Sequence, residues 1–160
     1  MEELAIRIIE STPHTVRRLT EALTPEQYRA RPWPREWSVI EIVGHLVDKT
    51  EVWGERFRRI ATESEPRLEA YDQDARVEER GYRQQELGAV LQRLAELTGT
   101  LARELRALPE EAWLRAGTHT ERGRITLAEG VRLYAISLPE HVEQLIRTRD
   151  AVLAGRQTRS

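Results

Sequence analysis

Cysteine is absent from the sequence, which excludes disulfide bonds, thiolate metal ligands and a cysteine nucleophile. Asparagine is absent as well, methionine occurs only at the first position, and Lys49 is the only lysine among 25 basic residues. Depletion of thermolabile residues is typical of thermophilic proteins, but a GC-rich genome produces the same bias towards arginine. Both explanations of the composition stay open.

Long hydrophobic runs and a large excess of one charge are also missing. No apolar segment approaches the roughly 20 residues that a membrane-spanning helix needs, and the first residues show no signal-peptide pattern. The net charge of −2 provides no electrostatic attraction for nucleic acid or an anionic membrane. We therefore expect a cytoplasmic protein that has neither a nucleic-acid partner nor a membrane partner.

Helical periodicity is the main pattern that the sequence does contain. Apolar residues recur at 3.6-residue spacing in four long segments, at about 2–23, 38–63, 83–108 and 126–152. Capping boxes begin the second and fourth segments, at Ser38–Glu41 and Thr126–Glu129. Pro13 predicts a kink or break near Ser11, and Pro139 predicts a bend or a gap in the last helix.

Strand signals are nearly absent, and the polar segment 64–82 is typical of a loop. The 160 residues, of which 39% are hydrophobic and 32% charged, are sufficient for one domain with a core, which we predict over 1–160. The sequence therefore predicts an all-α four-helix bundle with a long connection between its second and third helices.

Two histidines are the candidates for chemistry. His45 falls at the edge of the apolar stripe of the second helix, beside Val52, and His141 falls close to the stripe of the last helix. Tyr134 and Ser137 share a side with His141. Histidines at such positions are more often satisfied by a hydrogen bond than bound to a metal, so both interpretations stay open.

The other two histidines carry weaker signals. His14 follows Pro13 and is expected at the surface. His119 lies in the sequence GTHTERG, which is either a solvated loop or a loop that closes over the mouth of a cavity. Trp33, Trp37 and Trp113 are expected to anchor connections by packing.

Two stretches, TPEQYRARPWPREWSVIEIVGHLVDKTEVWGERF at 24–57 and GTHTERGRITLAEGVRLYAISLPEHVEQLIRTR at 117–149, resemble the DinB-like superfamily of four-helix bundles. The resemblance extends over nearly the whole chain. The matching residues are Trp37, Ser38, His45, Asp48 and Arg56 in the first stretch and Gly123, Thr126, Leu127, His141 and Gln144 in the second. Together, in this order and separation, they are specific for the fold.

The resemblance implies a metal site of known composition. Family members that bind metal hold a divalent ion such as nickel or zinc with three histidines, one on the second helix and an H-x-x-x-H pair on the last. His45 takes the first place and His141 the last, but Ser137 takes the middle place. A serine hydroxyl is a poor ligand for such ions, and two histidines alone rarely hold zinc tightly.

Three states of this site stay open. It is vestigial, with the histidines hydrogen-bonded through Ser137, Tyr134 or water. It binds a divalent metal weakly, with Asp48, Glu140 or water completing the shell. Or it is a metal-free pocket for a small-molecule ligand, lined by Tyr134, Ser137, Val52 and His119.

The function that we expect follows from this resemblance. We expect a DinB-like protein of unassigned biochemical role, associated with stress and working as a homodimer, with a degraded or altered metal site between the second and fourth helices. The alternative is a metal-dependent thiol transferase or isomerase that uses a low-molecular-weight thiol. The metal would then lower the pKa of the thiol.

Overall fold

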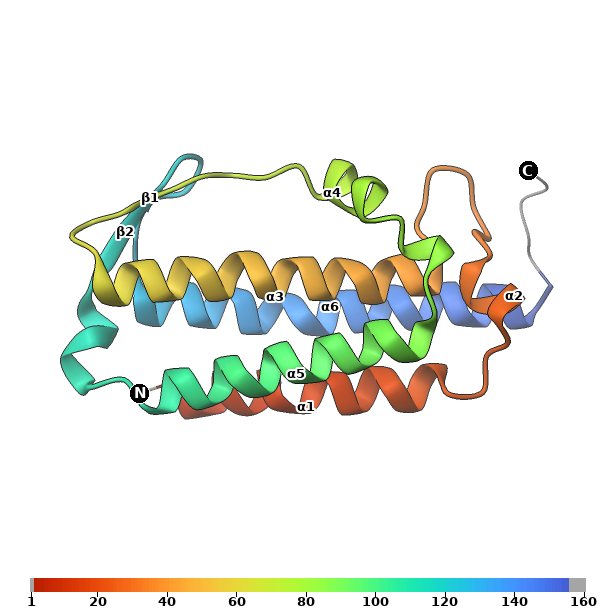
Figure 1. Cartoon of the computed structure of the whole chain (residues 1–160), viewed down its shortest axis with the longest axis horizontal. Helices are drawn as coiled ribbons and strands as arrows, with labels where there is room; N and C mark the ends of the chain where they lie inside the picture. The colour runs from red at the N-terminus through yellow and green to blue at the C-terminus, as the bar shows by residue number, and fades with distance from the viewer. Residues whose placement is uncertain (1, 156–160) are drawn as a thin grey trace.

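The structure, a computed structural model that describes residues 2–155, is built on four long helices (Figure 1). These are α1 (Glu3–Thr20), α3 (Val39–Thr62), α5 (Leu87–Arg106) and α6 (Leu127–Leu153). The connections carry α2 (Pro25–Arg29), β1 (Arg67–Leu68), α4 (Gln73–Arg80), η1 (Tyr82–Gln84), η2 (Glu110–Leu114), β2 (Ala116–His119) and β3 (Gly123–Thr126). The predicted four-helix bundle is confirmed. The predicted domain, 1–160, extends beyond the described residues at both ends.

The order of the helices around the bundle differs from their order in the sequence. Helix α1 packs against α5 and α6, and α3 packs against the same two helices, so α1 and α3 lie on a diagonal. In Figure 1, α3 and α5 run in the same direction along the bundle, opposite to α1 and α6. A short turn cannot join parallel neighbours. Residues 63–86 therefore return along the length of the bundle, which is the long connection that the sequence predicts.

This connection contains more regular structure than its polar sequence indicates. Helix α4 is capped at its start by Asp72, whose side chain accepts a hydrogen bond from the backbone N–H of Ala75, and at its end by Gly81 with φ of 61°. Strand β1 pairs in parallel with β2, and β2 pairs antiparallel with β3. The prediction of a loop over 64–82 was therefore wrong. Helix α4 has eight residues, of which only Val77 is buried, and β1 has two residues, so neither is long enough to show an apolar period.

The ends and the internal prolines of the helices can be compared with the remaining sequence predictions. Both capping boxes, at Ser38 and Thr126, are confirmed. Helices α1 and α6 continue through Pro13 and Pro139, so of the predicted kink or break near Ser11 the break was wrong, while the kink and the bend at Pro139 stay predictions. Each proline removes one backbone hydrogen bond, a loss that the tertiary packing of a long amphipathic helix offsets. Helix α5 starts four residues later than predicted, at Leu87, because η1 precedes it.

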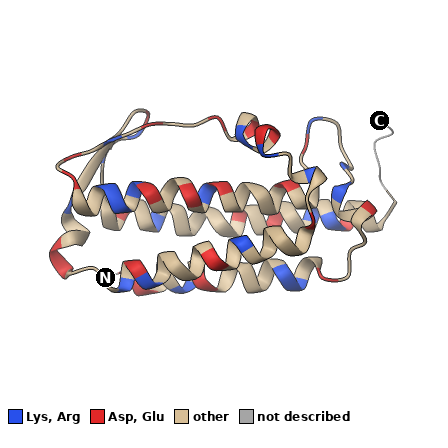
Figure 2. Cartoon of the chain, viewed as in Figure 1, with Lys and Arg blue, Asp and Glu red and all other residues tan. Residues whose placement is uncertain are grey.

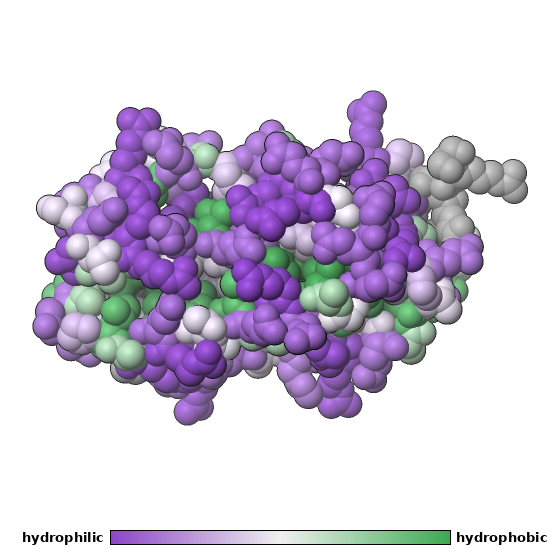
Figure 3. All heavy atoms as spheres, in the orientation of Figure 1, coloured by the Kyte–Doolittle hydropathy of each residue, from purple (hydrophilic) through white to green (hydrophobic). Residues whose placement is uncertain are grey.

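Helix α3 is the most enclosed part of the chain, since every residue from Val39 to Thr50 is buried. Acidic and basic residues are interspersed along the helices (Figure 2), and the face in Figure 3 is mainly hydrophilic, with hydrophobic residues visible in a broken band. Within residues 2–155, no helix is long and apolar enough to cross a membrane. The homodimer and the cytoplasmic location stay predictions.

Candidate functional site

The two predicted histidines meet between α3 and α6. His45 is fully buried, His141 is half-buried, and their Nε2 atoms are 3.3 Å apart. The two rings form a T-shaped contact with centroids 4.6 Å apart, and the ring of Trp37 lies 4.7 Å from that of His45. His45 is more buried than helical periodicity indicates, because Trp37 from the preceding connection and His141 from α6 both cover it.

Hydrogen bonding determines which nitrogen of His141 carries the proton. Its Nδ1 lies 3.2 Å from Oε1 of Gln144. An amide oxygen only accepts hydrogen bonds, so this Nδ1 donates and the Nε2 of the neutral ring presents a lone pair towards His45. Metal-ligating histidines are oriented in the same way, by a polar partner on the second ring nitrogen. The Nδ1 of His45 is buried and has no partner among the described residues.

Both imidazoles are held in the neutral form. Burial, together with the smaller effects of His141 and Lys49, lowers the pKa of His45 to about 3. Burial also lowers the pKa of His141, against the hydrogen bond to Gln144, which raises it. Since only a neutral imidazole can coordinate a metal, the pair is in the form that ligation needs.

The distance between the histidines fits two ligands of one ion. Zinc–nitrogen bonds are about 2.0–2.1 Å long, so two nitrogens on a tetrahedral ion are about 3.3–3.4 Å apart. The Nε2 atoms of His45 and His141 are separated by 3.3 Å. The separation therefore equals that of two ligands of a tetrahedral ion, and it is also the length of a direct hydrogen bond between the two rings.

The rest of that shell is not supplied by the predicted residues. The Oγ of Ser137 donates to the carbonyl of Tyr134 at 2.6 Å. Asp48 accepts a hydrogen bond of 2.6 Å from the Tyr82 hydroxyl, and Glu140 is exposed. Among the described residues there is no group of three or more His, Asp or Glu side chains that could hold a metal. A metal at the pair would take its other ligands from water or substrate.

The other predicted pocket residues have separate places. Tyr134 is fully buried, and its hydroxyl lies 2.7 Å from Oγ1 of Thr50. Val52 is half-buried on α3. His119 is buried on β2, where Nδ1 accepts hydrogen bonds from the two backbone N–H groups of residues 121 and 122. His119 therefore shapes the β2–β3 turn and does not join the histidine pair, whereas His14 is exposed, as predicted.

A cavity of about 100 Å³ lies one helical turn from His45, between α3, the segment before α4 and the β2–β3 hairpin. We call it the cationic pocket; its defining residues are Lys49, Trp53, Arg56, Tyr71, His119 and Arg122. Sequence reasoning included His119 but missed the other residues. The available signal was Lys49 itself, the only lysine, placed among the apolar residues of a helix.

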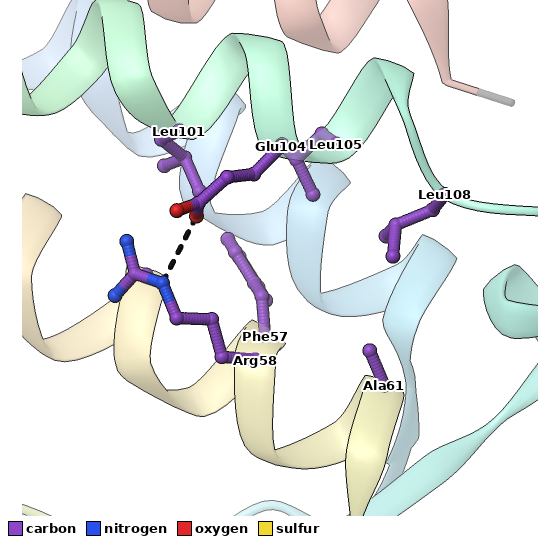
Figure 4. A pocket seen from close by; sticks show the side chains of 8 residues that line it. Phe57, Arg58, Ala61, Leu101, Glu104, Leu105 and Leu108 are labelled. Carbon is purple, nitrogen blue, oxygen red and sulfur yellow. Dashed lines mark hydrogen bonds and ion pairs between the residues drawn. The ribbon is translucent and has the colours of Figure 1, made fainter.

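A second pocket, between α3 and α5, offers no chemistry (Figure 4). It measures about 40 Å³ and is lined mainly by apolar groups such as Phe57, Leu101 and Leu105. Its two charged residues bind each other, since Nε of Arg58 donates to Oε2 of Glu104 at 2.9 Å. This pocket therefore presents no unpaired charge to a ligand.

Comparison with known proteins identifies relatives over most of the chain. The profile of the DinB superfamily matches residues 8–153. Over 141 residues the chain is 26% identical to "Putative metal-dependent hydrolase YfiT" of Bacillus subtilis (strain 168), which covers 88% of this chain and 79% of that protein. The solved structure of YfiT superposes with a TM-score of 0.85 and 25% identity, over 96% of this chain and 87% of that one. Its description is a probable metal-dependent hydrolase with an unusual four-helix bundle topology.

Proposed function

The chain belongs to the DinB superfamily, and from this premise we propose that its histidine pair binds a divalent cation weakly and supports metal-assisted hydrolysis of a small molecule. The observation that carries the proposal is the 3.3 Å separation of the Nε2 atoms of His45 and His141. The name of the similar protein, "Putative metal-dependent hydrolase YfiT", supports the same class of reaction.

The binding is weak because the chain supplies only two ligands. Ser137 occupies the position at which the metal-binding proteins that the sequence resembles have a histidine, and its hydroxyl donates a hydrogen bond to the backbone. Two imidazoles leave two positions of a tetrahedral shell open. Open positions are what a catalytic site needs, whereas a structural site is closed by protein ligands.

The chain's own residues have separate tasks at this site. The imidazoles of His45 and His141 hold the ion, Gln144 keeps the Nδ1 of His141 protonated, and Trp37 shields His45 from water. When bound, a divalent ion lowers the pKa of a coordinated water or thiol and polarises a carbonyl or phosphoryl oxygen. The thiol-dependent alternative uses the same open position, but nothing among the described residues favours a thiol over water.

Metal binding is tested by calorimetric titration of zinc and nickel into protein purified without a histidine tag. The wild type is expected to bind one ion per chain, and Ser137→His is expected to bind at least about tenfold more tightly by supplying the third imidazole. His141→Gln is expected to abolish binding. The matched control is His14→Gln, which changes an exposed histidine on α1 and should leave binding unchanged.

Two results would overturn the proposal. If only Ser137→His binds metal, the wild-type site is a remnant that no longer holds an ion. If neither protein binds, the two histidines do not share a ligand position. When binding is found, the reaction class is tested on a panel of carboxylate and phosphate esters. Hydrolysis that chelator inhibits and that His141→Gln lacks supports the proposed reaction. If the metal-bound protein hydrolyses none of the esters, the proposed reaction is contradicted.

A further inference from the structure

We propose that the cationic pocket binds an oxyanion, the carboxylate or phosphate group of a small molecule. The inference goes beyond the histidine pair, because it uses no metal and depends on different side chains. It rests on the burial of two cations that form no ion pair with residues 2–155, on a cavity that both of them line, and on an unpaired hydroxyl at the same place.

Lys49 is the first of these cations. Its side chain is only 9% exposed, and it makes no hydrogen bond or ion pair with any of residues 2–155. Burial lowers its pKa, and the charge of the exposed Glu140 offsets only part of that lowering. Lysine side chains are rarely buried to this extent without a partner, so an ammonium group that lines a cavity and forms no ion pair with residues 2–155 is available to an anionic ligand.

Arg56 is the second cation, and it lies on the same side of α3. Its guanidinium lies over the ring of Trp53, 4.8 Å from the centroid, and 5.9 Å from the centroid of Tyr71. It is 6% exposed and donates to the carbonyl of Glu69, but it forms no ion pair within the described part of the chain. Aromatic rings and a neutral carbonyl hold this guanidinium in position and leave its charge uncompensated.

Charge repulsion within the pocket supports the same conclusion. Burial is the largest cause that lowers the pKa of Lys49 and of Arg56. The charge of Arg122, at the exposed rim, lowers both further, while the charge of Glu121 raises that of Arg56. The carboxylate among the lining residues is Glu121, which is exposed on the hairpin. An anion in the cavity would relieve this repulsion and would be attracted by three cations at once.

Two neutral donors complete the site. The hydroxyl of Tyr71 is buried without a hydrogen-bond partner, and burial raises the pKa of this phenol to about 12, so it keeps its proton and can donate. The Nδ1 of His119 accepts from the backbone of the hairpin, which leaves the proton of the neutral ring on Nε2 as a second donor. These donors and the three cations suit oxygen atoms that carry negative charge.

The size and the place of the cavity limit the ligand. A volume of about 100 Å³ accommodates a carboxylate or phosphate group but not a whole nucleotide or peptide. The charge of Lys49 also acts on both histidines of the neighbouring pair, so an anion bound here lies next to that pair. The rest of the ligand can therefore extend towards the site of the proposed hydrolysis.

The test is calorimetric titration of inorganic phosphate and, separately, acetate into protein in chelator, with ionic strength held constant by chloride. One saturable site is expected for at least one of the two anions. Lys49→Met should weaken binding about tenfold or more, since hydrogen bonds to charged groups are among the strongest. Arg122→Met should weaken it severalfold, and Arg122 is exposed, so this variant should fold normally.

The matched control is Arg124→Met, which removes an exposed arginine of the same hairpin that pairs with Glu65 outside the pocket. Binding of phosphate alone assigns a phosphate group, and binding of acetate alone assigns a carboxylate. The inference is overturned if neither anion saturates at millimolar concentrations, or if Arg124→Met weakens binding as much as Arg122→Met. Since chelator removes metal from this experiment, its failure leaves the metal titration of the histidine pair unaffected.

Discussion

Two neighbouring stripes of polar residues on α3 differ in whether their buried side chains have partners of opposite charge. The acidic stripe consists of Glu41, Asp48 and Glu51, and the basic stripe consists of His45, Lys49 and Arg56. Spacings of four and eleven residues keep the basic residues on one face of a 3.6-residue helix, with the acidic residues on the adjacent face. One helix therefore buries both signs of charge along most of its length.

Every carboxylate of the acidic stripe has at least one partner, although Oδ2 of Asp48 is buried without one among the described residues. Glu41 accepts from Arg31, Glu51 accepts from arginines of α4 at 2.7 and 2.9 Å, and Asp48 accepts from the hydroxyl of Tyr82 at 2.6 Å. In the basic stripe, by contrast, none of the three side chains forms an ion pair with a carboxylate of residues 2–155. The difference indicates that the acidic stripe binds the connections to the bundle, Glu41 the segment before α3 and Asp48 and Glu51 the segment 63–86, whereas the basic stripe is left open for ligands.

The largest effect is expected where the acidic stripe meets its aromatic partner. A Cβ added at Gly44 would lie 2.2 Å from the ring of Tyr82, so Gly44→Ala must displace that ring and its hydrogen bond to Asp48. We expect a loss of about 3 kcal/mol in the free energy of unfolding. Urea denaturation measures it. The control is Gly88→Ala on α5, which has open space around it and should stabilise by up to about 1 kcal/mol.

Removing a partner from the acidic stripe should have the next largest effect. Arg31→Met leaves the carboxylate of Glu41, which is 3% exposed, without its guanidinium. Because Arg31 is about a third exposed and water screens the pair, we expect destabilisation of about 2 kcal/mol rather than the full value for a buried pair. Adding Glu41→Gln should recover part of the loss in the same denaturation experiment. No recovery would show that Arg31 acts through other contacts.

Removing a charge from the basic stripe should raise the free energy of unfolding, whereas removing one from the acidic stripe's partners lowers it. Lys49→Met keeps the apolar stem and removes an unpaired buried charge, so we expect stabilisation by about 1 kcal/mol in the free energy of unfolding. Denaturation of the wild type and the variant without added anion measures the difference. A destabilised variant would mean that Lys49 has a partner in solution, and the contrast between the two stripes would then be incorrect.

The pH dependence of the free energy of unfolding tests whether the cations of the pocket act on a neighbouring side chain, His119. Burial, followed by the charges of Arg56 and Arg122, lowers the pKa of His119 below its ordinary value of 6.5. A lowered pKa means that the unfolded chain binds the proton first. Stability is therefore fully present above pH 6.5 and is lost as the pH falls below it, with a slope of at most about 1.4 kcal/mol per pH unit from this group.

The variant His119→Asn isolates that contribution. Asparagine keeps an acceptor for the backbone N–H groups of the hairpin turn but does not titrate. Thermal unfolding in chelator between pH 7 and pH 5 should show a shallower loss of stability in the variant than in the wild type. The control, His14→Asn on α1, should leave the wild-type slope unchanged. Equal slopes for wild type and His119→Asn would show that His119 does not sense pH.

The smallest effect is expected at the exposed pair beside the apolar pocket. Arg58 and Glu104 are each nearly half exposed, so Arg58→Met should change the free energy of unfolding by about 0.5 kcal/mol or less. The same denaturation series measures it against Arg31→Met. A loss as large as that of Arg31→Met would show that pairing on α3 matters regardless of burial.

Part of the site could be predicted from the sequence and part could not. The positions of His45 and His141 in two apolar stripes predicted that they are near the core, and the structure brings their rings together. The segment 64–82, by contrast, has no long periodic pattern, so α4 and the short strand β1 were not predicted. Since Tyr71 and His119 approach Lys49 only through this segment and the hairpin, the cationic pocket could not be predicted either.

The sequence by itself determined the four long helices, their capping boxes and the presence of two histidines in the core-facing stripes. Local hydrogen bonding and the 3.6-residue period act over a few residues, so they can be recognised in a linear pattern. Only the tertiary structure decided the diagonal order of the helices, the 3.3 Å contact of the histidines and the absence of an ion pair between Lys49 and residues 2–155. These depend on how residues far apart in the chain cover one another, because burial, and not residue type, determines whether a charge is paired, shielded or available to a ligand.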